Sequence, residues 1–432
     1  MPVKTRSGPG RPTLLGFLSA LLTGKPAALR FEPCRDFVPP ALAEAGVYVH
    51  VPFCRSLCPY CPYLRGPYRP READDFCAAL EREVAWYAAR MPLLRTGSVY
   101  LGGGTPTVLG ARLEGLVARL RQRLDPQGPL CIESNPADLD DTTVSRLAGL
   151  GFESVSVGVQ SFDERVLSFL GRGYTAGAAH RALERLAAAG IASVNLDLMF
   201  AIPGQDEASW QRDLDAAVAS PATQVTAYPL FTFPYSEVGA ALGARRLRMP
   251  PWRTRRRMYF QLYDALVGAG FRRVSAWSFQ RGAGHRFSSV TRSRYLGFGP
   301  SGGSCYGSTF TLNTFSLAQY VASTRERGHA VSLAMPMTRE LDVLMDLYWR
   351  AYDTRVSLDR WRQAILEVPR LGKALAAATA LGLCEDNGEE LALTRRGSFW
   401  IHLLQNHAAL PGVATLWDAG KREPWPAAVS LH

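Results

Sequence analysis

The residues best suited to chemistry are three closely spaced cysteines, Cys54, Cys58 and Cys61, in the stretch "VHVPFCRSLCPYCPY". Thiolates at this spacing can converge on one centre if the segment forms a loop, and sulfur ligands select zinc or iron–sulfur clusters. Zinc would take a fourth protein ligand, for which His50 is the nearest candidate. A four-iron, four-sulfur cluster on three cysteines instead leaves one iron open to a cofactor or substrate.

Two further features follow short apolar runs. Gly102, Gly103 and Gly104 in "YLGGGTPT" predict either a tight turn or a close approach of the backbone to a ligand. Asp197 lies inside the apolar run "NLDLMF". A buried aspartate is costly unless it is hydrogen-bonded, which favours a functional role for Asp197.

The elements that must position these residues alternate between strand and helix. Six β-branched runs, each followed by a helical pattern, predict βαβ units and a parallel sheet. The runs are 47–51, 98–102, 130–134, 154–159, 193–200 and 224–230, with a further candidate at 272–279. The pattern favours an α/β fold of the partial (β/α)6 barrel type over a doubly wound open sheet, and functional residues are expected at the strand C-termini.

The pattern changes near Met335, where helical stretches and an Asn387-Gly388 turn predict a helical, winged-helix-like module. We therefore expect an N-terminal arm at 1–46, a barrel with its extension at 47–310 and a C-terminal cap at 311–432.

The charge and the cysteine content of the chain indicate its cellular compartment and the classes of partner that it could bind. The 432 residues carry a net charge of +11, and seven arginines fall within 245–257. Such a run suits phosphates, a polycarboxylate substrate or nucleic acid, or else is a solvated helix face. No nucleic-acid recognition motif accompanies it, which makes nucleic acid an unfavoured partner. Three of the eight cysteines are clustered and five are scattered, a pattern that indicates a reducing, cytoplasmic location.

The N-terminal stretch "RPTLLGFLSALLTGKPAA" superficially resembles a secretory signal. Its apolar run is too short to span a bilayer, so we expect a short amphipathic helix and no membrane span.

The motif Cys54-x3-Cys58-x2-Cys61, with Tyr60 before the last cysteine, resembles the radical S-adenosylmethionine (SAM) signature. That resemblance implies a [4Fe–4S] cluster whose open iron binds SAM, and an electron donor such as flavodoxin or ferredoxin. Further stretches, from about Tyr48 to Gln405, resemble the oxygen-independent coproporphyrinogen III oxidase branch.

The same resemblance assigns roles to individual residues. It implies catalytic roles for Tyr48 and Glu133 and places the other matching residues around one SAM. Members of the branch can hold a second SAM at the segment that the glycine-rich stretch 295–307 resembles, so the resemblance leaves one or two SAM molecules open. The cofactor-binding set that it implies is Tyr60, Gly102, Gly103, Gly104, Thr105, Glu133, Gln160, Arg172, Asp197 and Gly302.

The sequence departs from the motifs of this branch at positions that affect which reaction is expected. Pro62 and Tyr63 stand where the oxidases have glycine and cysteine after the third ligand, which weakens oxidative decarboxylation of a porphyrinogen. The arginine run favours an anionic substrate and keeps that reaction open, beside two-SAM methyl or methylene transfer to an sp2 carbon.

The expected substrate is a planar, tetrapyrrole-like or aromatic small molecule. A binding protein is the alternative to an enzyme. Related haem chaperones carry a His-Asn and Tyr-Trp signature that this chain lacks, with His285 left as a candidate haem ligand. A zinc-stabilised structural protein is the third interpretation.

Overall fold

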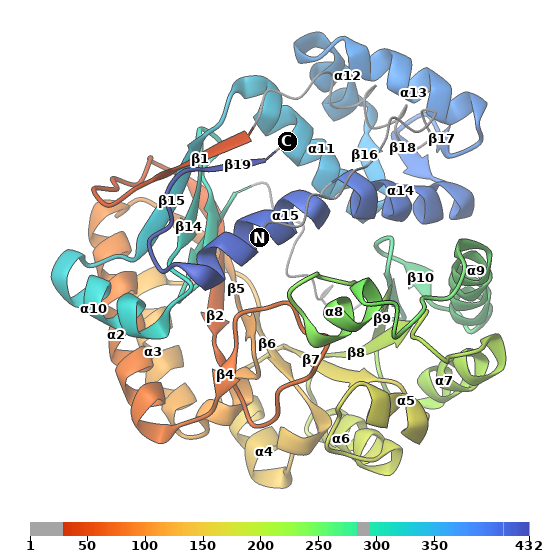
Figure 1. Cartoon of the computed structure of the whole chain (residues 1–432), viewed down its shortest axis with the longest axis horizontal. Helices are drawn as coiled ribbons and strands as arrows, with labels where there is room; N and C mark the ends of the chain where they lie inside the picture. The colour runs from red at the N-terminus through yellow and green to blue at the C-terminus, as the bar shows by residue number, and fades with distance from the viewer. Residues whose placement is uncertain (1–28, 283–293, 409, 432) are drawn as a thin grey trace.

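The computed structural model describes residues 29–282, 294–408 and 410–431. The predicted amphipathic helix near the N-terminus and His285 lie outside the described residues. The described chain is organised around one 14-stranded sheet in the order β10-β11-β9-β8-β7-β6-β5-β2-β12-β13-β14-β15-β1-β19 (Figure 1).

Six consecutive strands of this sheet are parallel and form the partial barrel, so the predicted α/β fold class is confirmed. They are β2 (Glu44–Val51), β5 (Arg95–Gly103), β6 (Leu130–Ser134), β7 (Ser154–Gln160), β8 (Ser193–Phe200) and β9 (Gln224–Pro229). Each coincides with a predicted run, and the two edges of the sheet do not meet, as expected for an incomplete barrel.

The candidate seventh strand at 272–279 differs from the expectation. It forms two short strands, β10 (Arg272–Arg273) and β11 (Ser278–Gln280), and β11 runs antiparallel to β9. The chain turns between them because the Ser275 hydroxyl accepts hydrogen bonds from the backbone N–H groups of Trp277 and Ser278 at 3.2 and 2.9 Å. The additional parallel strand is β12 (Tyr295–Phe298), which pairs with the opposite edge strand β2.

Helices connect the parallel strands and cover the outer face of the sheet (Figure 1). They are α2 (Pro70–Arg90), α3 (Arg112–Leu124), α4 (Asp141–Gly149), α5 (Glu164–Phe169), α6 (Ala176–Ala188) and α7 (Glu207–Ala219). Two more helices, α8 (Glu237–Gly243) and α9 (Trp252–Gly268), follow β9. Most begin at a polar cap: Asp140 and Asp206, for example, accept hydrogen bonds from Thr143 and Ser209 backbone N–H groups.

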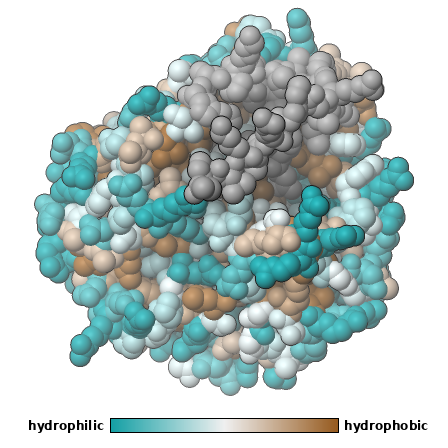
Figure 2. Space-filling view, in the orientation of Figure 1, coloured by the Kyte–Doolittle hydropathy of each residue, from teal (hydrophilic) through white to brown (hydrophobic). Residues whose placement is uncertain are grey.

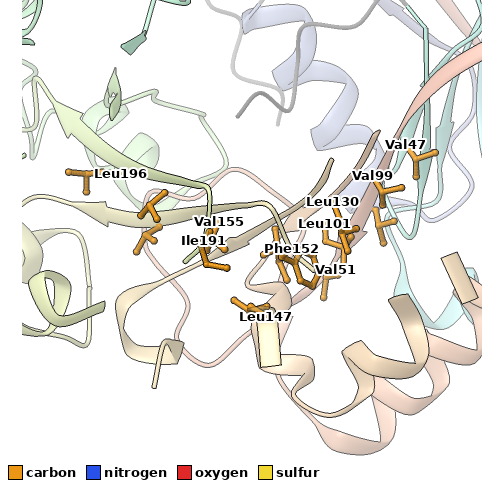
Figure 3. Close-up of a cluster of buried hydrophobic side chains, with 14 of the residues drawn as sticks. Val47, Val51, Val99, Leu101, Leu130, Leu147, Phe152, Val155, Ile191 and Leu196 are labelled. Carbon is orange, nitrogen blue, oxygen red and sulfur yellow. The ribbon is translucent and has the colours of Figure 1, made fainter. Parts of the chain in front are cut away.

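The hydrophobic core lies between the strands and these helices. Figure 3 shows buried side chains of this core, among them Val47, Val99, Leu101 and Val155 from the strands and Leu147 of α4, all nearly or fully buried. Burial of this apolar surface holds the strands at fixed spacing, so that their carboxyl ends meet at one rim of the barrel.

The sheet continues beyond the barrel through β13 (Gly303–Cys305), β14 (Thr309–Asn313) and β15 (Val331–Pro336), with α10 (Leu317–Arg327) between the last two. The predicted boundary at 310/311 therefore falls inside β14. β1 (Leu29–Pro33) pairs with β15 and with β19 (Val429–Leu431), so part of the predicted N-terminal arm belongs to the sheet.

The remaining C-terminal residues combine helices with a small antiparallel sheet in the order β16-β18-β17. The elements are α11 (Arg339–Asp353), β16 (Arg355–Ser357), α12 (Leu358–Glu367), α13 (Arg370–Ala380), β17 (Cys384–Asp386), β18 (Glu390–Leu393), α14 (Arg395–Ala408) and α15 (Leu410–Arg422). The Asn387-Gly388 turn joins β17 to β18. The division into three parts at the stated boundaries stays a prediction.

None of the helices within the described ranges is long and apolar enough to cross a membrane. Figure 2 shows hydrophilic and hydrophobic residues interspersed over the coloured part of this face.

Candidate active site

The carboxyl ends of the parallel strands open into one cavity of about 690 Å³, a size typical of small-molecule sites. Most of the predicted site residues line it. They are Cys54, Cys58, Tyr60, Cys61, Gly103, Gly104, Thr105, Glu133, Gln160, Arg172 and Asp197. Tyr48, Gly102 and Gly302 are not among the lining residues.

The cysteine loop, residues 54–65, is held at both ends by the barrel. Cys54 lies in β3 (Phe53–Cys54), which pairs with β4 (Gly66–Pro67) where the loop returns. Inside the loop, the Arg65 guanidinium donates to the backbone carbonyls of Cys58 and Cys61, the latter at 3.1 Å. The loop therefore presents all three thiols on the cavity wall.

Two of these thiols have polar partners. The Thr105 hydroxyl donates to Cys54 Sγ at 3.6 Å, and Arg172 Nη1 donates to Cys58 Sγ at 3.1 Å. Burial raises the pKa of Cys54 to about 11 and also raises the pKa of Cys61. Metal binding deprotonates thiols outright, and the nearby guanidinium would stabilise the resulting negative charge.

This donor set fits an iron–sulfur cluster better than the zinc alternative with His50. Both ring nitrogens of His50 are engaged: Nε2 is 2.8 Å from the Leu64 carbonyl oxygen and Nδ1 is 3.0 Å from the Tyr48 hydroxyl. Among the described residues, no three His, Cys, Asp or Glu side chains are arranged around a single ion. A cluster does not require that arrangement, because each thiolate binds a different iron.

The three glycines bring the end of β5 against the cysteine loop. A Cβ at Gly104 would lie 2.4 Å from the Phe53 carbonyl oxygen, and one at Gly103 would lie 2.6 Å from the His50 ring. Gly103 also has a φ of 109°, which disfavours other residues. Gly102 packs beside Tyr100 and Glu133 rather than on the cavity.

Glu133 is held on the cavity wall by two donors. The Tyr100 hydroxyl donates to Oε1 at 2.5 Å and the Gly103 N–H donates to Oε2 at 3.0 Å. Burial raises the pKa of this carboxyl group. Tyr48 lies behind it, with its ring centroid 5.9 Å from that of Tyr100.

Gln160 and Arg172 meet at the end of β7. Gln160 has a φ of 70° at a bulge in the pairing of β7 with β8, a conformation that non-glycine residues adopt mainly at constrained sites. Its Oε1 accepts a hydrogen bond from the Tyr228 hydroxyl at 3.2 Å. Arg172 links Cys58 to the carbonyl oxygen of Gly158 and to the Tyr174 hydroxyl.

Asp197 is satisfied by neighbours that the sequence analysis missed. Ser156 Oγ donates to its Oδ2 at 2.7 Å, and Asn195 Nδ2 donates to its Oδ1 at 2.8 Å. Burial raises the pKa of Asp197 to about 7. Ser156 and Asn195 alternate with buried valines and leucines along β7 and β8, and that alternation is a sequence signal for interior polar positions.

The glycine-rich segment 295–307 does not face the cavity at Gly302. It forms β12 and β13, and a Cβ at Gly302 would lie 2.6 Å from the Gly297 carbonyl oxygen. The glycines thus permit close backbone packing. A ligand beside Gly302 stays a prediction.

Aromatic side chains from distant parts of the chain also line the cavity. Trp277 follows β10, while Tyr348, Trp349 and Tyr352 come from α11 of the C-terminal part. The sequence analysis missed them because their place depends on how α11 packs against the barrel. In contrast, no residue of the run 245–257 lines the cavity.

The comparisons with known proteins agree with this geometry. Residues 48–217 match the radical SAM superfamily. The chain is 32% identical over 376 residues to heme chaperone HemW of Mycobacterium tuberculosis strain H37Rv, covering 82% of this chain and 91% of that protein. It is 26% identical over 350 residues to oxygen-independent coproporphyrinogen III oxidase of Salmonella typhimurium, covering 74% and 75%.

The structure of coproporphyrinogen III oxidase (HemN) from Escherichia coli superposes with a TM-score of 0.72 at 22% identity, covering 91% of this chain and 93% of that one. The chain belongs to the radical SAM superfamily. Within it, the chain belongs to the HemN-like branch, which includes proteins named heme chaperones as well as oxidases.

Proposed function

We propose that Cys54, Cys58 and Cys61 hold a [4Fe–4S] cluster and that SAM binds beside it, within the same cavity. Support comes from the three thiols on one cavity wall and from the family to which the chain belongs. The chemistry that the bound cluster and SAM supply is reductive cleavage of SAM to a 5′-deoxyadenosyl radical, which abstracts a hydrogen atom. A one-electron carrier such as flavodoxin or ferredoxin would deliver the electron.

The polar strand ends supply the groups that would hold SAM. Glu133 and Asp197 offer carboxylates to its amino and ribose hydroxyl groups, and Arg172 offers a guanidinium to its carboxylate. Because each of these side chains is fixed by protein hydrogen bonds, little conformational entropy remains to be lost on binding.

We further propose that the substrate is a tetrapyrrole. The observation that carries this is the aromatic lining of the cavity, where Trp277, Tyr348 and Tyr352 open onto the same space as the cysteine loop. Flat aromatic walls suit a planar macrocycle. The relatives named for coproporphyrinogen and heme support the same class.

The enzymatic reaction that we favour over methyl transfer is oxidative decarboxylation of a propionate side chain of the tetrapyrrole. A hydrogen atom is abstracted from the side chain, carbon dioxide leaves, and the remaining electron passes to a one-electron acceptor. Methyl transfer would use a second SAM, which was expected at Gly302, and Gly302 packs against backbone instead. One SAM is sufficient for the proposed reaction.

Haem binding without turnover is the second candidate. It is favoured by the relatives named heme chaperone, one of which aligns with 82% of this chain. All eight cysteines, none of them in a disulfide, suit a cytoplasmic location.

The deciding experiment uses anaerobically reconstituted, reduced protein with SAM, analysed by mass spectrometry. Replacing Cys54, Cys58 or Cys61 with alanine is expected to abolish the cluster and 5′-deoxyadenosine formation together, whereas Cys77→Ala, on α2, should preserve both. Cluster absorption retained in any of the three alanine variants would refute the ligand assignment.

The same samples distinguish the two candidates. 5′-Deoxyadenosine that accumulates only with coproporphyrinogen, together with released carbon dioxide, supports the oxidase. S-adenosylhomocysteine would indicate methyl transfer. An intact cluster, no substrate-dependent product and stoichiometric haem binding support the chaperone.

A further inference from the structure

The arginine run that does not reach the cavity forms a basic surface beside α8 and α9. Arg245, Arg246, Arg248 and Arg253 are all exposed, and none of the four has an ion pair with a described residue. We call these four residues the arginine edge. Of the seven arginines in 245–257, Arg257 is the one paired with a described acid, Glu207, at 2.8 Å.

This surface is attached directly to the cysteine loop. The backbone N–H of Val238, in α8, donates to the carbonyl oxygen of Pro59, which lies between Cys58 and Cys61, at 3.3 Å. Leu247 and Met249, which alternate with the edge arginines, pack in the same apolar cluster as Tyr60. Figure 1 shows α8 beside the loop that leads to β4.

The arginine edge also has the composition of a protein interface. Trp252 lies next to Arg253 and is 49% exposed, which is unusual for so large an apolar side chain. Tryptophan and arginine are enriched at the centres of protein–protein interfaces. Four exposed arginines without an ion pair to a described residue, together with an exposed tryptophan, therefore fit an acidic protein partner.

We propose that the arginine edge docks an acidic one-electron carrier protein, which reduces the cluster through the cysteine loop. The proposal rests on the proposed function, because it requires a cluster at Cys54, Cys58 and Cys61. In each encounter the reduced carrier loses one electron and the oxidised cluster gains it, so no other reactant is needed. Docking here would place the carrier against the segment that packs on the loop, rather than at the aromatic cavity where substrate binds.

The test is stopped-flow reduction of the reconstituted holoprotein by photoreduced flavodoxin, an acidic carrier, at low ionic strength. The edge variant combines Arg246→Glu, Arg248→Glu and Arg253→Glu. The matched control combines Arg123→Glu, Arg325→Glu and Lys373→Glu, which changes net charge equally on α3, α10 and α13, at exposed positions without ion pairs to described residues. Reduction by dithionite is measured for each protein.

We expect the second-order rate constant with flavodoxin to fall about tenfold or more in the edge variant and to change much less in the control, with the difference shrinking as salt is added. Dithionite reduction should be unchanged in both.

Equal flavodoxin rates in the edge variant and the control would overturn the docking proposal. A second result would also overturn it: the wild type binds nucleic acid, the edge variant does not, and the rate of reduction by flavodoxin is the same in both. The arginine edge would then be a nucleic-acid surface. Failure of dithionite to reduce the wild-type cluster would refute the proposed function itself, and the docking proposal with it.

Discussion

Replacing Glu83 with glutamine should make the stability of this protein less dependent on pH. Glu83 lies on α2 with its side chain fully buried, and it ties the glycine-rich segment to the barrel. Its carboxyl group accepts hydrogen bonds from the Gly299 N–H at 2.8 Å, the Tyr320 hydroxyl at 2.7 Å and the Asn313 amide at 2.7 Å. Two opposing effects therefore act on its pKa.

Burial disfavours the ionised carboxylate, whereas the three donors favour it, and burial is the larger effect. The pKa of Glu83 rises from its ordinary value of 4.5 to about 7. A raised pKa in the folded state means that the stabilisation is complete below pH 4.5 and is lost as the pH rises through 7. At about 1.36 kcal/mol per pKa unit, the wild type should lose about 2.5 kcal/mol between pH 5 and pH 8 that a glutamine variant keeps.

Thermal unfolding of the cluster-free protein measures this difference. With an unfolding entropy of about 2.1 cal/mol/K per residue, 2.5 kcal/mol corresponds to about 3 °C in Tm for a chain of this length. The Tm of Glu83→Gln minus that of the wild type should therefore rise by about 3 °C from pH 5 to pH 8. The glutamine also loses a bond from Gly299, but that cost is the same at both pH values.

Asp75→Asn, at an exposed position on the same helix and without an ion pair to a described residue, serves as the control. A difference in Tm that falls with pH would show that the three donors outweigh burial and hold the carboxylate ionised. A flat difference would show that the two effects cancel.

Two further predictions concern the site. Gly104→Ala would place a Cβ 2.4 Å from the Phe53 carbonyl oxygen. We therefore expect this variant to have a markedly lower iron and sulfide content after reconstitution and an unchanged far-UV circular dichroism spectrum. The control is Gly115→Ala, whose Cβ would meet nothing within 4 Å and which should reconstitute normally. Ser156→Ala removes a hydrogen-bond donor to Asp197. Because such a hydrogen bond is worth about 1 kcal/mol, the affinity for SAM measured by calorimetry should fall about fivefold. An unchanged affinity would place SAM away from Asp197.

The barrel could be predicted because its signal is local. Each parallel strand is a short β-branched run followed by a helical pattern, and parallel pairing places the end of every strand at one rim. Functional residues were therefore expected at the strand C-termini, and the buried position of Asp197 favoured a functional role, whereas the role of Glu133 followed from the family resemblance. Glu83 carries a local signal as well, since it interrupts the buried stripe formed by Leu80 and Tyr87 on α2.

The remaining features depend on contacts between distant segments. Glycines that admit a ligand and glycines that admit a neighbouring backbone look alike in sequence, and Gly302 proved to pack against Gly297. Tyr348 and Tyr352 carry an ordinary helical pattern, and their place in the cavity follows from how α11 meets the barrel. The stretch 272–279 looked like one strand in the sequence, but it forms two short strands. The turn between them at Ser275 depends on hydrogen bonds from backbone N–H groups to a side chain.

Pro62 and Tyr63, which stand where the oxidases have glycine and cysteine, contact helix α15, which packs over the cysteine loop. Lys421 donates to the Pro62 carbonyl oxygen, and the Tyr63 ring lies 5.6 Å from that of Trp417. In Figure 1, α15 crosses the view between the C-terminal helices and α8. A tyrosine in this position adds an aromatic contact between the loop and the C-terminal helix, where a glycine–cysteine pair would leave a gap. Since α11, from the same C-terminal part, also supplies aromatic side chains to the cavity wall, movement of that part would alter access to the cysteine loop and to the rest of the cavity together.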